Sequence, residues 1–116
     1  MSWTVLLHSV FNKESKDFPI DAQEALASMV ELLEQHGPQL KRPHCDTLYG
    51  SRHSNMKELR FAAADGAWRV AFAFDPKRRA VLLVGGDKSG MSQQKFYKAL
   101  IRKADARFGE WLEDAE

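Results

Sequence analysis

The second half of the chain holds four residues whose side chains could act on a phosphodiester: Arg60, Arg69, Lys88 and Tyr97. Guanidinium and ammonium groups orient a phosphate and stabilise the charge that develops on it, while a phenol can transfer a proton. Metal-free cleavage of RNA needs little more, because the substrate's own 2′-hydroxyl serves as the nucleophile. These four residues are therefore candidates for such chemistry, with a histidine or a lysine as the alternative group for proton transfer. Plain nucleic-acid binding by the same basic surface is the alternative.

Other chemistries lack the residues that they require. The single cysteine, Cys45, rules out a disulfide within the chain and a cysteine-based zinc site. His44 and His53 have no partner at the spacing of metal ligands. The sequence contains no HExxH, nucleophile-elbow or GxGxxG motif. We therefore expect neither a metal nor a cofactor.

The distribution of charge indicates an anionic partner more clearly than the net charge does. The 116 residues carry a formal net charge of +1. Residues 37–103 hold fourteen Lys and Arg against five Asp and Glu, while the segments before and after them each have a net charge of −4. Because a polyanion responds to the local field, the central segment is the expected contact region. A chance arrangement of solvated charges is the competing interpretation.

Hydrophobic spacing predicts the elements that position these side chains. Residues 5–7 are predicted to form a short strand buried on both faces. Residues 21–36 are predicted to form a helix, because their apolar positions recur every three or four residues, and Gly37 and Pro38 end it. Residues 38–55 are polar and predict a basic loop with at most one short helical turn. A final helix is predicted from about Ser92 onward.

Three apolar runs between the loop and the final helix, at 56–62, 67–75 and 80–85, predict an antiparallel meander. Turn signals separate the runs at Asp65-Gly66 and at Asp75-Pro76. The order strand, helix, meander, helix predicts one α+β domain over residues 1–116. Its small antiparallel sheet would consist of the N-terminal strand and the meander, with helices packed on one side.

The first hairpin of this meander brings two arginines together. If it closes around Ala64 and Asp65, Arg60 lies opposite Arg69, and both face away from the core on an open surface. Like charges directly opposite each other destabilise a strand pair by a few tenths to ~1 kcal/mol. An anionic ligand, or partial compensation by Glu58, is therefore expected beside them.

Five stretches of sequence together resemble a known family. They are GPQLKRPHCDTLYGSRHSN, MKELRF, WRVAFAFDP, AVLLVGGDK and FYKALIRKAD, and they resemble RelE/HigB-like toxins of type II toxin–antitoxin modules, in particular the phage-derived subgroup. The resemblance covers roughly residues 20–105. It implies a RelE/ParE-like fold and an mRNA endonuclease (mRNA interferase) that inhibits translation by cutting mRNA in the ribosomal A site. It also implies a helix-turn-helix antitoxin as the cognate partner, in addition to the ribosome and mRNA.

The resemblance also implies roles for individual positions. Arg60 and Arg69 match the basic positions of the first two meander strands, and Lys88 matches the cation after the last strand. These three would clamp the scissile phosphate, and Tyr97, which matches the family's tyrosine loosely, would serve as acid or base. Contacts with the RNA backbone or with ribosomal RNA are predicted for His53, Lys57, Arg78 and Arg79.

Two alternative functions are also considered, together with the expected location in the cell. The related ParE-like branch uses the same fold to inhibit DNA gyrase, and a non-catalytic relative would bind only RNA or the antitoxin. The N-terminal stretch MSWTVLLHSVF predicts structure rather than a signal peptide. No apolar run reaches the ~18 residues of a membrane span. We therefore expect a cytoplasmic protein with no membrane partner.

Overall fold

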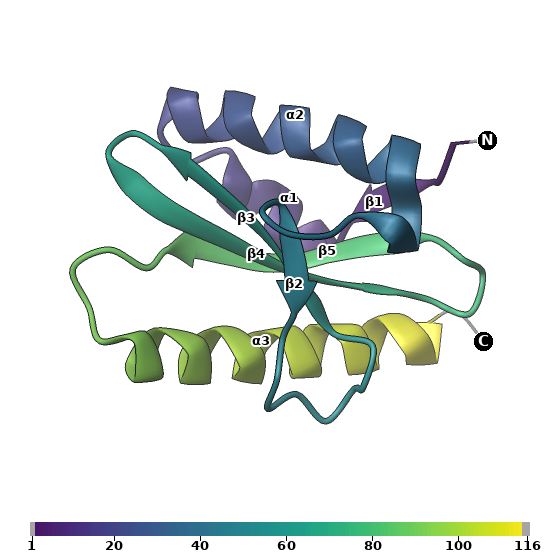
Figure 1. Ribbon diagram of the computed structural model, residues 1–116. Coiled ribbons are helices and arrows are strands. Elements are labelled where there is room, and N and C mark those ends of the chain that lie inside the picture. Colours follow the sequence, from purple (N-terminus) through teal and green to yellow (C-terminus); the bar gives the residue numbers. More distant parts are fainter. Residues whose placement is uncertain (1, 115–116) are drawn as a thin grey trace.

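A computed structural model describes residues 2–114 as a sheet between two layers of helix, with α2 over one face and α3 over the other (Figure 1). The elements follow one another in the order β1 (Val5–Leu7), α1 (Ser9–Ser15), α2 (Ile20–His36), the 3₁₀ helix η1 (Gly37–Gln39), β2 (Cys45–Thr47), β3 (Lys57–Ala63), β4 (Gly66–Phe74), β5 (Ala80–Asp87) and α3 (Gln93–Asp114). Within residues 2–114, no helix has the length and apolar character needed to cross a membrane.

Across the described residues 2–114, the sheet has five strands in the order β1-β5-β4-β3-β2. The predicted meander is confirmed, because β3, β4 and β5 pair antiparallel in sequence. The predicted purely antiparallel sheet is wrong in one respect, since β1 pairs parallel to β5 and makes the sheet mixed. The strand β1 is also half-buried rather than buried, because it lies at the edge of the sheet and has one neighbouring strand.

Helices cover both faces of the sheet, so the prediction of helices on one side is wrong. One apolar cluster joins Val70, Phe72 and Leu82 to α1 and α2. A second joins Ala71 and Leu83, which face the other way, to α3. The strand β4 is consequently buried at six successive positions, 68–73, as expected for a strand enclosed on both faces.

Two elements lie in segments where no regular structure was predicted. The short helix α1 begins after His8, whose side chain accepts a hydrogen bond from the backbone N–H of Val10. The strand β2 lies within the predicted basic loop and pairs with β3, from Cys45 opposite Leu59 to Thr47 opposite Lys57. Because β2 is the outermost strand, it adds a polar edge beside β3.

The hairpin between β3 and β4 fixes the position of the candidate site. Its loop consists of Ala64 and Asp65, both with positive φ (49° and 60°), and Ala63 pairs with Gly66. Two successive left-handed residues give a tight turn whose twist matches that of the flanking strands. The register of the two strands therefore follows from the turn, and the predicted pairing of Arg60 with Arg69 is confirmed.

Candidate active site

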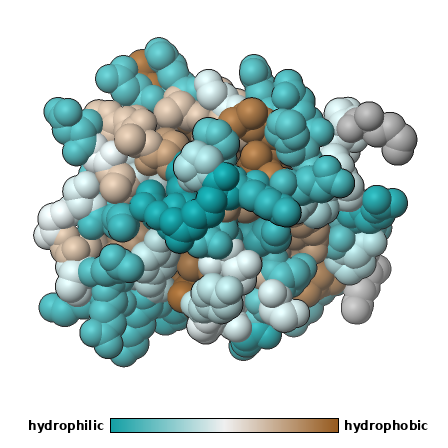
Figure 2. Space-filling view, in the orientation of Figure 1, coloured by the Kyte–Doolittle hydropathy of each residue, from teal (hydrophilic) through white to brown (hydrophobic). Residues whose placement is uncertain are grey.

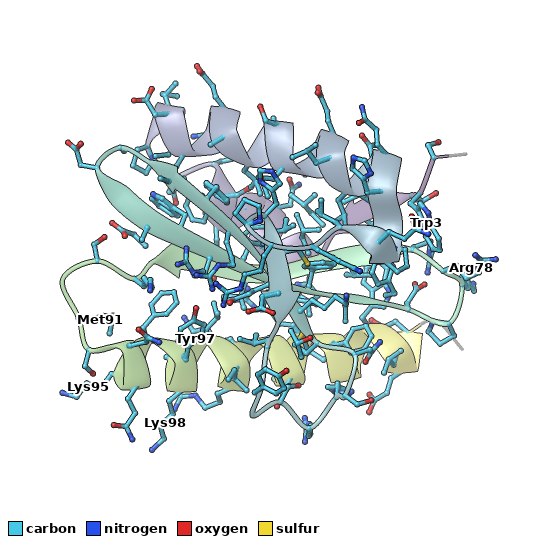
Figure 3. The ribbon with its side chains drawn as sticks, in the orientation of Figure 1. Trp3, Arg78, Met91, Lys95, Tyr97 and Lys98 are labelled. Atoms are coloured by element: carbon cyan, nitrogen blue, oxygen red, sulfur yellow. The ribbon has the colours of Figure 1, made fainter. Side chains whose placement is uncertain are left out.

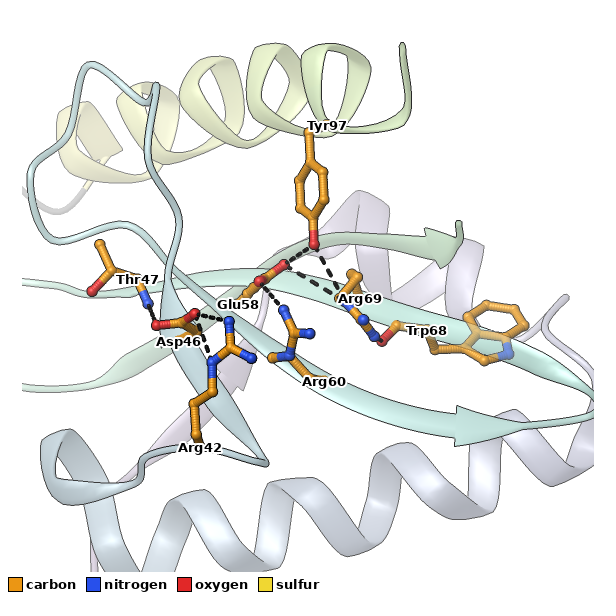
Figure 4. A network of polar contacts seen from close by, with 8 residues as sticks. All are labelled: Arg42, Asp46, Thr47, Glu58, Arg60, Trp68, Arg69 and Tyr97. Carbon is orange, nitrogen blue, oxygen red and sulfur yellow. Dashed lines mark hydrogen bonds and ion pairs between the residues drawn. The ribbon is translucent and has the colours of Figure 1, made fainter. Parts of the chain in front are cut away.

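A buried carboxylate links the two paired arginines to the final helix (Figure 4). Glu58 precedes Arg60 by two residues on β3, so both side chains lie on the face of the sheet that α3 covers. Nη1 of Arg60 donates a hydrogen bond to Oε2 of Glu58 at 2.8 Å. The hydroxyl of Tyr97, on α3, donates to Oε1 of Glu58 at 2.8 Å. We call Glu58, Arg60, Arg69 and Tyr97 the Glu58 cluster.

Arg69 completes this cluster from β4. Its Nε lies 3.9 Å from Oε1 of Glu58 and donates to the hydroxyl oxygen of Tyr97 at 3.3 Å. Its Nη1 donates to the backbone carbonyl of Trp68 at 2.8 Å. These contacts hold the guanidinium in one orientation, because Nε faces Glu58 and Tyr97 while Nη1 is bound to the Trp68 carbonyl.

The prediction that this face of the sheet is open is wrong. Glu58 and Arg69 retain only 3% and 7% of their accessible surface, because α3 packs over this part of the sheet. Glu58 also neutralises one of the two positive charges, so the predicted compensation by Glu58 is confirmed. One net positive charge remains among these three side chains. Arg60, whose side chain is 21% exposed, presents it to solvent.

Tyr97 projects from α3 toward the sheet and combines an apolar ring with a polar tip (Figure 3). Its ring packs edge-on against Phe96, and its hydroxyl reaches the Glu58 carboxylate. Burial raises the pKa of the Tyr97 phenol above its ordinary value, and the hydrogen bond to Glu58 raises it further. The phenol is therefore protonated at neutral pH, which suits a proton donor rather than a base.

Lys88 lies just beyond β5, next to the strand that carries Arg69. Its backbone N–H donates to the carbonyl of Ala67 at 2.8 Å, which extends the β4–β5 ladder by one step. Gly86 pairs with Arg69, so the alternation along the strand places Lys88 on the α3 side of the sheet. The residue is half-buried and forms no ion pair within residues 2–114.

Two of the residues predicted to bind RNA do not join the Glu58 cluster. Lys57 lies one position before Glu58 on β3 and therefore faces the opposite side of the sheet, where it borders a hollow with Leu40 and Cys45. The ring of His53 packs edge-on against Phe108 on α3 at 4.9 Å. Its Nε2 is buried and has no hydrogen-bond partner among residues 2–114. Roles in RNA binding for these two residues stay predictions.

The other two predicted RNA contacts lie at the opposite end of β4, in the turn that leads to β5. The guanidinium of Arg78 stacks over Trp3 at 4.9 Å, and Figure 3 shows both far from Tyr97. Arg79 forms an ion pair with the fully buried Asp75, with 2.7 Å between Nη2 and Oδ2. Both arginines therefore have partners within the protein, and their roles in RNA binding stay predictions for a separate surface.

The sequence reasoning missed a second polar pair, Arg42 and Asp46, which lies beside the Glu58 cluster at the edge of the sheet. Asp46 on β2 pairs with Glu58 on β3, and it accepts hydrogen bonds from Arg42 at 2.7 and 3.0 Å. The Arg42 guanidinium holds the pKa of Asp46 below its ordinary value. Hydrophilic side chains consequently cover the middle of this face, over β2 (Figure 2). One usable signal was Glu58 itself, since an acid within a buried strand requires a cationic partner.

The chemical capacity of the Glu58 cluster follows from its composition. A carboxylate can accept a proton, two guanidinium groups can bind a phosphate, and a protonated phenol can donate a proton. Three separate elements, β3, β4 and α3, bring these groups within contact distance. Within residues 2–114, no cluster of three or more potential metal-ligating side chains occurs.

Solved structures define the class of fold. The toxin RelE of E. coli in its free state matches with a TM-score of 0.63 over 89% of this chain and 97% of RelE, at 10% sequence identity. The archaeal RelE–RelB complex from Pyrococcus horikoshii matches with a TM-score of 0.57 over 78% of this chain and 100% of the matched chain, at 17% identity. The chain therefore has a RelE-like α+β fold, as predicted.

Sequence relatives define the family. Residues 11–109 match the family described as phage derived protein Gp49-like. Two Mycobacterium tuberculosis proteins carry the toxin names HigB3 and HigB2. HigB3 is 45% identical over 92 residues, which cover 79% of this chain and 78% of HigB3. HigB2 is 42% identical over 97 residues, which cover 83% of this chain but only 48% of HigB2. The chain belongs to the Gp49-like phage-derived family, and the predicted resemblance is confirmed.

Proposed function

We propose that this protein is the toxin of a type II toxin–antitoxin module and that it cleaves mRNA on the ribosome without a metal ion. Kinship with proteins named as HigB toxins supports the first part of the proposal. The observation that carries the second part is the Glu58 cluster, in which a carboxylate, two guanidinium groups and a phenol hydroxyl share one position on the sheet. Residues 1–116 would act as one toxin domain in the cytoplasm.

The geometry supports a specific division of labour. The partly exposed Arg60 draws in the scissile phosphate, whose charge displaces Glu58 from the two guanidinium groups. Glu58 then accepts the proton of the 2′-hydroxyl as its oxygen bonds to phosphorus. Arg60, Arg69 and Lys88 stabilise the phosphorane. Tyr97 protonates the departing 5′-oxygen as the P–O5′ bond breaks, which leaves a 2′,3′-cyclic phosphate and a 5′-hydroxyl.

The proposal includes a cognate antitoxin that blocks this activity. A RelE chain has been solved in complex with RelB, and a helix-turn-helix protein encoded beside the toxin gene would be the counterpart here. Neutralisation requires only that the partner cover or distort the surface around Arg60 and Tyr97. Co-expression of the adjacent gene should therefore restore the growth of cells that express this protein.

Mapping of mRNA 5′ ends after induction of the protein tests the proposed activity. We expect growth arrest within one generation and new 5′ ends inside translated reading frames, in register with codons. A parallel assay of DNA gyrase supercoiling should show no inhibition. Growth arrest with intact mRNA and inhibited supercoiling would instead select the ParE-like function. Ribosome binding without any cleavage would select a non-catalytic relative.

A further inference from the structure

The outer surface of α3 carries a stripe of exposed cations that the proposed reaction does not use. Lys95, Lys98 and Arg102 are all exposed. Their spacing of three and four residues places them on one side of the helix, over a length of about 10 Å. Within the described residues 2–114, none of them forms an ion pair. We call these three residues the α3 stripe.

The α3 stripe faces away from the Glu58 cluster. Figure 3 shows Tyr97 directed toward the sheet, while Lys95 and Lys98 project from the opposite side of the same helix. The side of α3 that packs on the sheet is occupied by a separate apolar set, Phe96, Leu100, Ala104 and Phe108. The stripe is therefore a second basic surface, and a phosphate held at Arg60 does not reach it.

The fold itself gives no reason for cations at this position. A helix favours acidic residues in its first turn and basic residues in its last turn, because of its macrodipole. The helix α3 has neither, and Lys95 lies in its first turn. Three of its four acids, Glu110, Glu113 and Asp114, lie instead toward its C-terminal end, and the fourth, Asp105, accepts hydrogen bonds from Ser51 and from the backbone of Arg52. The charges at the two ends of α3 are thus the reverse of the stabilising arrangement, so the stability of the helix does not explain the cations of the stripe.

We propose that the α3 stripe binds the phosphate backbone of double-helical RNA while the Glu58 cluster acts on the scissile strand. This inference rests on the proposed function, because it supplies that function with a docking contact to structured RNA. Lysine and arginine contacts with phosphates position a protein on RNA without reading sequence. A rigid helix with cations along one side suits the regular backbone of a duplex.

The composition of the stripe disfavours two other anionic partners. Proteins that hold single strands stack bases on aromatic side chains, and none of the exposed residues of α3 is aromatic. Basic helices that lie on membranes insert an apolar side into the lipid. The apolar side of α3 is already buried against the sheet. Duplex RNA is therefore the partner that fits.

The salt dependence of RNA binding tests this proposal. The probe is a fluorescein-labelled duplex of about 20 base pairs in which every 2′-hydroxyl is methylated, so that no cleavage occurs. The test variant is Lys95→Gln/Lys98→Gln. The matched control is Lys13→Gln/Lys16→Gln, which removes the same charge from two exposed lysines at α1.

We expect the test variant to bind the duplex at least about tenfold more weakly near 0.1 M salt. The slope of log Kobs against log salt should fall in magnitude by about two, one for each lost phosphate contact, while the control keeps the wild-type slope. An unchanged slope in the test variant, or an equal loss in both variants, would overturn the proposal. Wild-type binding to phosphatidylserine vesicles but not to the duplex would overturn it as well.

A cleavage assay on ribosome-bound mRNA separates this inference from the proposed function. If the wild-type protein cuts mRNA but the Lys95→Gln/Lys98→Gln variant binds the duplex normally, the docking surface is refuted and the endonuclease stands. If duplex binding depends on the stripe but no cleavage occurs, the endonuclease is refuted and the docking surface stands.

Discussion

At the residue scale, Glu58 has two effects that oppose each other. In the free protein its carboxylate neutralises part of the charge of Arg60 and Arg69 and so reduces their attraction for phosphate. In the proposed reaction the same carboxylate accepts the proton of the 2′-hydroxyl. Substrate binding and proton transfer should therefore respond in opposite directions when this charge is removed.

The substitution Glu58→Gln separates the two effects. Glutamine keeps hydrogen-bond acceptance but carries no charge, so we expect equal or tighter RNA binding and a cleavage rate lower by about 10²–10⁴-fold. Single-turnover cleavage and binding to a methylated RNA measure the two quantities. Glu14→Gln, which changes a carboxylate paired with Arg107 outside the cluster, is the control and should leave both unchanged. Full activity of Glu58→Gln would exclude Glu58 as the base.

The substitution Tyr97→Phe tests the proposed acid. It keeps the ring contact with Phe96 and removes the hydroxyl, so we expect cleavage to fall by about 10²–10⁴-fold in a folded protein. Because the pKa of Tyr97 is raised, the phenol should lose its proton only above pH 10. The wild-type cleavage rate should therefore fall only in that range. Cleavage rates measured from pH 6 to 11 check this. A fall in the wild-type rate near neutral pH that the Phe variant lacks would contradict the assignment.

Contacts set by local sequence could be predicted, whereas contacts between distant parts of the chain could not. The pairing of Arg60 with Arg69 followed from a two-residue turn four positions away. The contact of Tyr97 with Glu58 joins residues 39 apart and depends on how α3 packs, which no local pattern specifies. Arg79 was predicted to be a surface cation, because the sequence identifies its partner Asp75 only as a turn residue.

At the element scale, Asp75 connects the β4–β5 turn to α3. Its fully buried carboxylate accepts hydrogen bonds from the backbone N–H groups of Lys77 and Arg79, from the Arg79 side chain and from the indole N–H of Trp111. We expect Asp75→Asn to lower the free energy of unfolding by about 2–3 kcal/mol, because hydrogen bonds to a charged group are lost at a buried site. Urea denaturation measures this, and a loss below 0.5 kcal/mol would contradict it.

The lowered pKa of the Asp75 carboxylate also predicts how the stability of the protein changes with pH. Burial acts to raise the pKa of Asp75, but hydrogen bonds from Arg79 and Trp111 outweigh it and hold the pKa below its ordinary value of 3.8. The folded state therefore binds this proton less readily than the unfolded state does. The stabilisation is fully present above about pH 4–5 and is lost as pH falls through the lowered pKa. In the Asp75→Asn variant, the free energy of unfolding should accordingly depend less on pH in the acidic range.

The substitution Lys95→Gln should make α3 more stable. A cation in the first helical turn opposes the macrodipole, so its removal should raise the free energy of unfolding by about 0.3–1 kcal/mol at low ionic strength. Urea denaturation at low and high salt measures the gain, which salt should diminish. Lys16→Gln, outside any helix, is the control. Destabilisation by Lys95→Gln would show that the cation serves the fold.

Elements with strong patterns were predicted, and weak or non-local ones were not. The helix predicted at 21–36 is observed as Ile20–His36, and the three meander strands agree to within about two residues at each end. The strand β2 has three residues in a polar segment and forms only because β3 offers an edge. The parallel orientation of β1 depends on its pairing with β5, more than 70 residues away.

At the scale of the whole molecule, α3 connects the two proposed activities. Its inner side presents Tyr97 to the Glu58 cluster, and its outer side carries the α3 stripe. The basic character of residues 37–103 is thus divided between separate surfaces rather than gathered in one patch. The sequence shows that the positive charge is concentrated in this segment. It does not show which basic residues share a surface, because that depends on which side of each strand and helix faces solvent.

Cleavage of mRNA in reconstituted ribosomal complexes with an empty A site tests the central claim most directly. The partly exposed Arg60 is the residue to change, since Arg60→Ala leaves the buried Glu58–Arg69–Tyr97 contacts in place. The wild-type protein should cut within the A-site codon and leave a 2′,3′-cyclic phosphate, and a folded Arg60→Ala variant should be about 10²–10³-fold slower. Intact mRNA with the wild-type protein, or wild-type cleavage by Arg60→Ala, would contradict the claim.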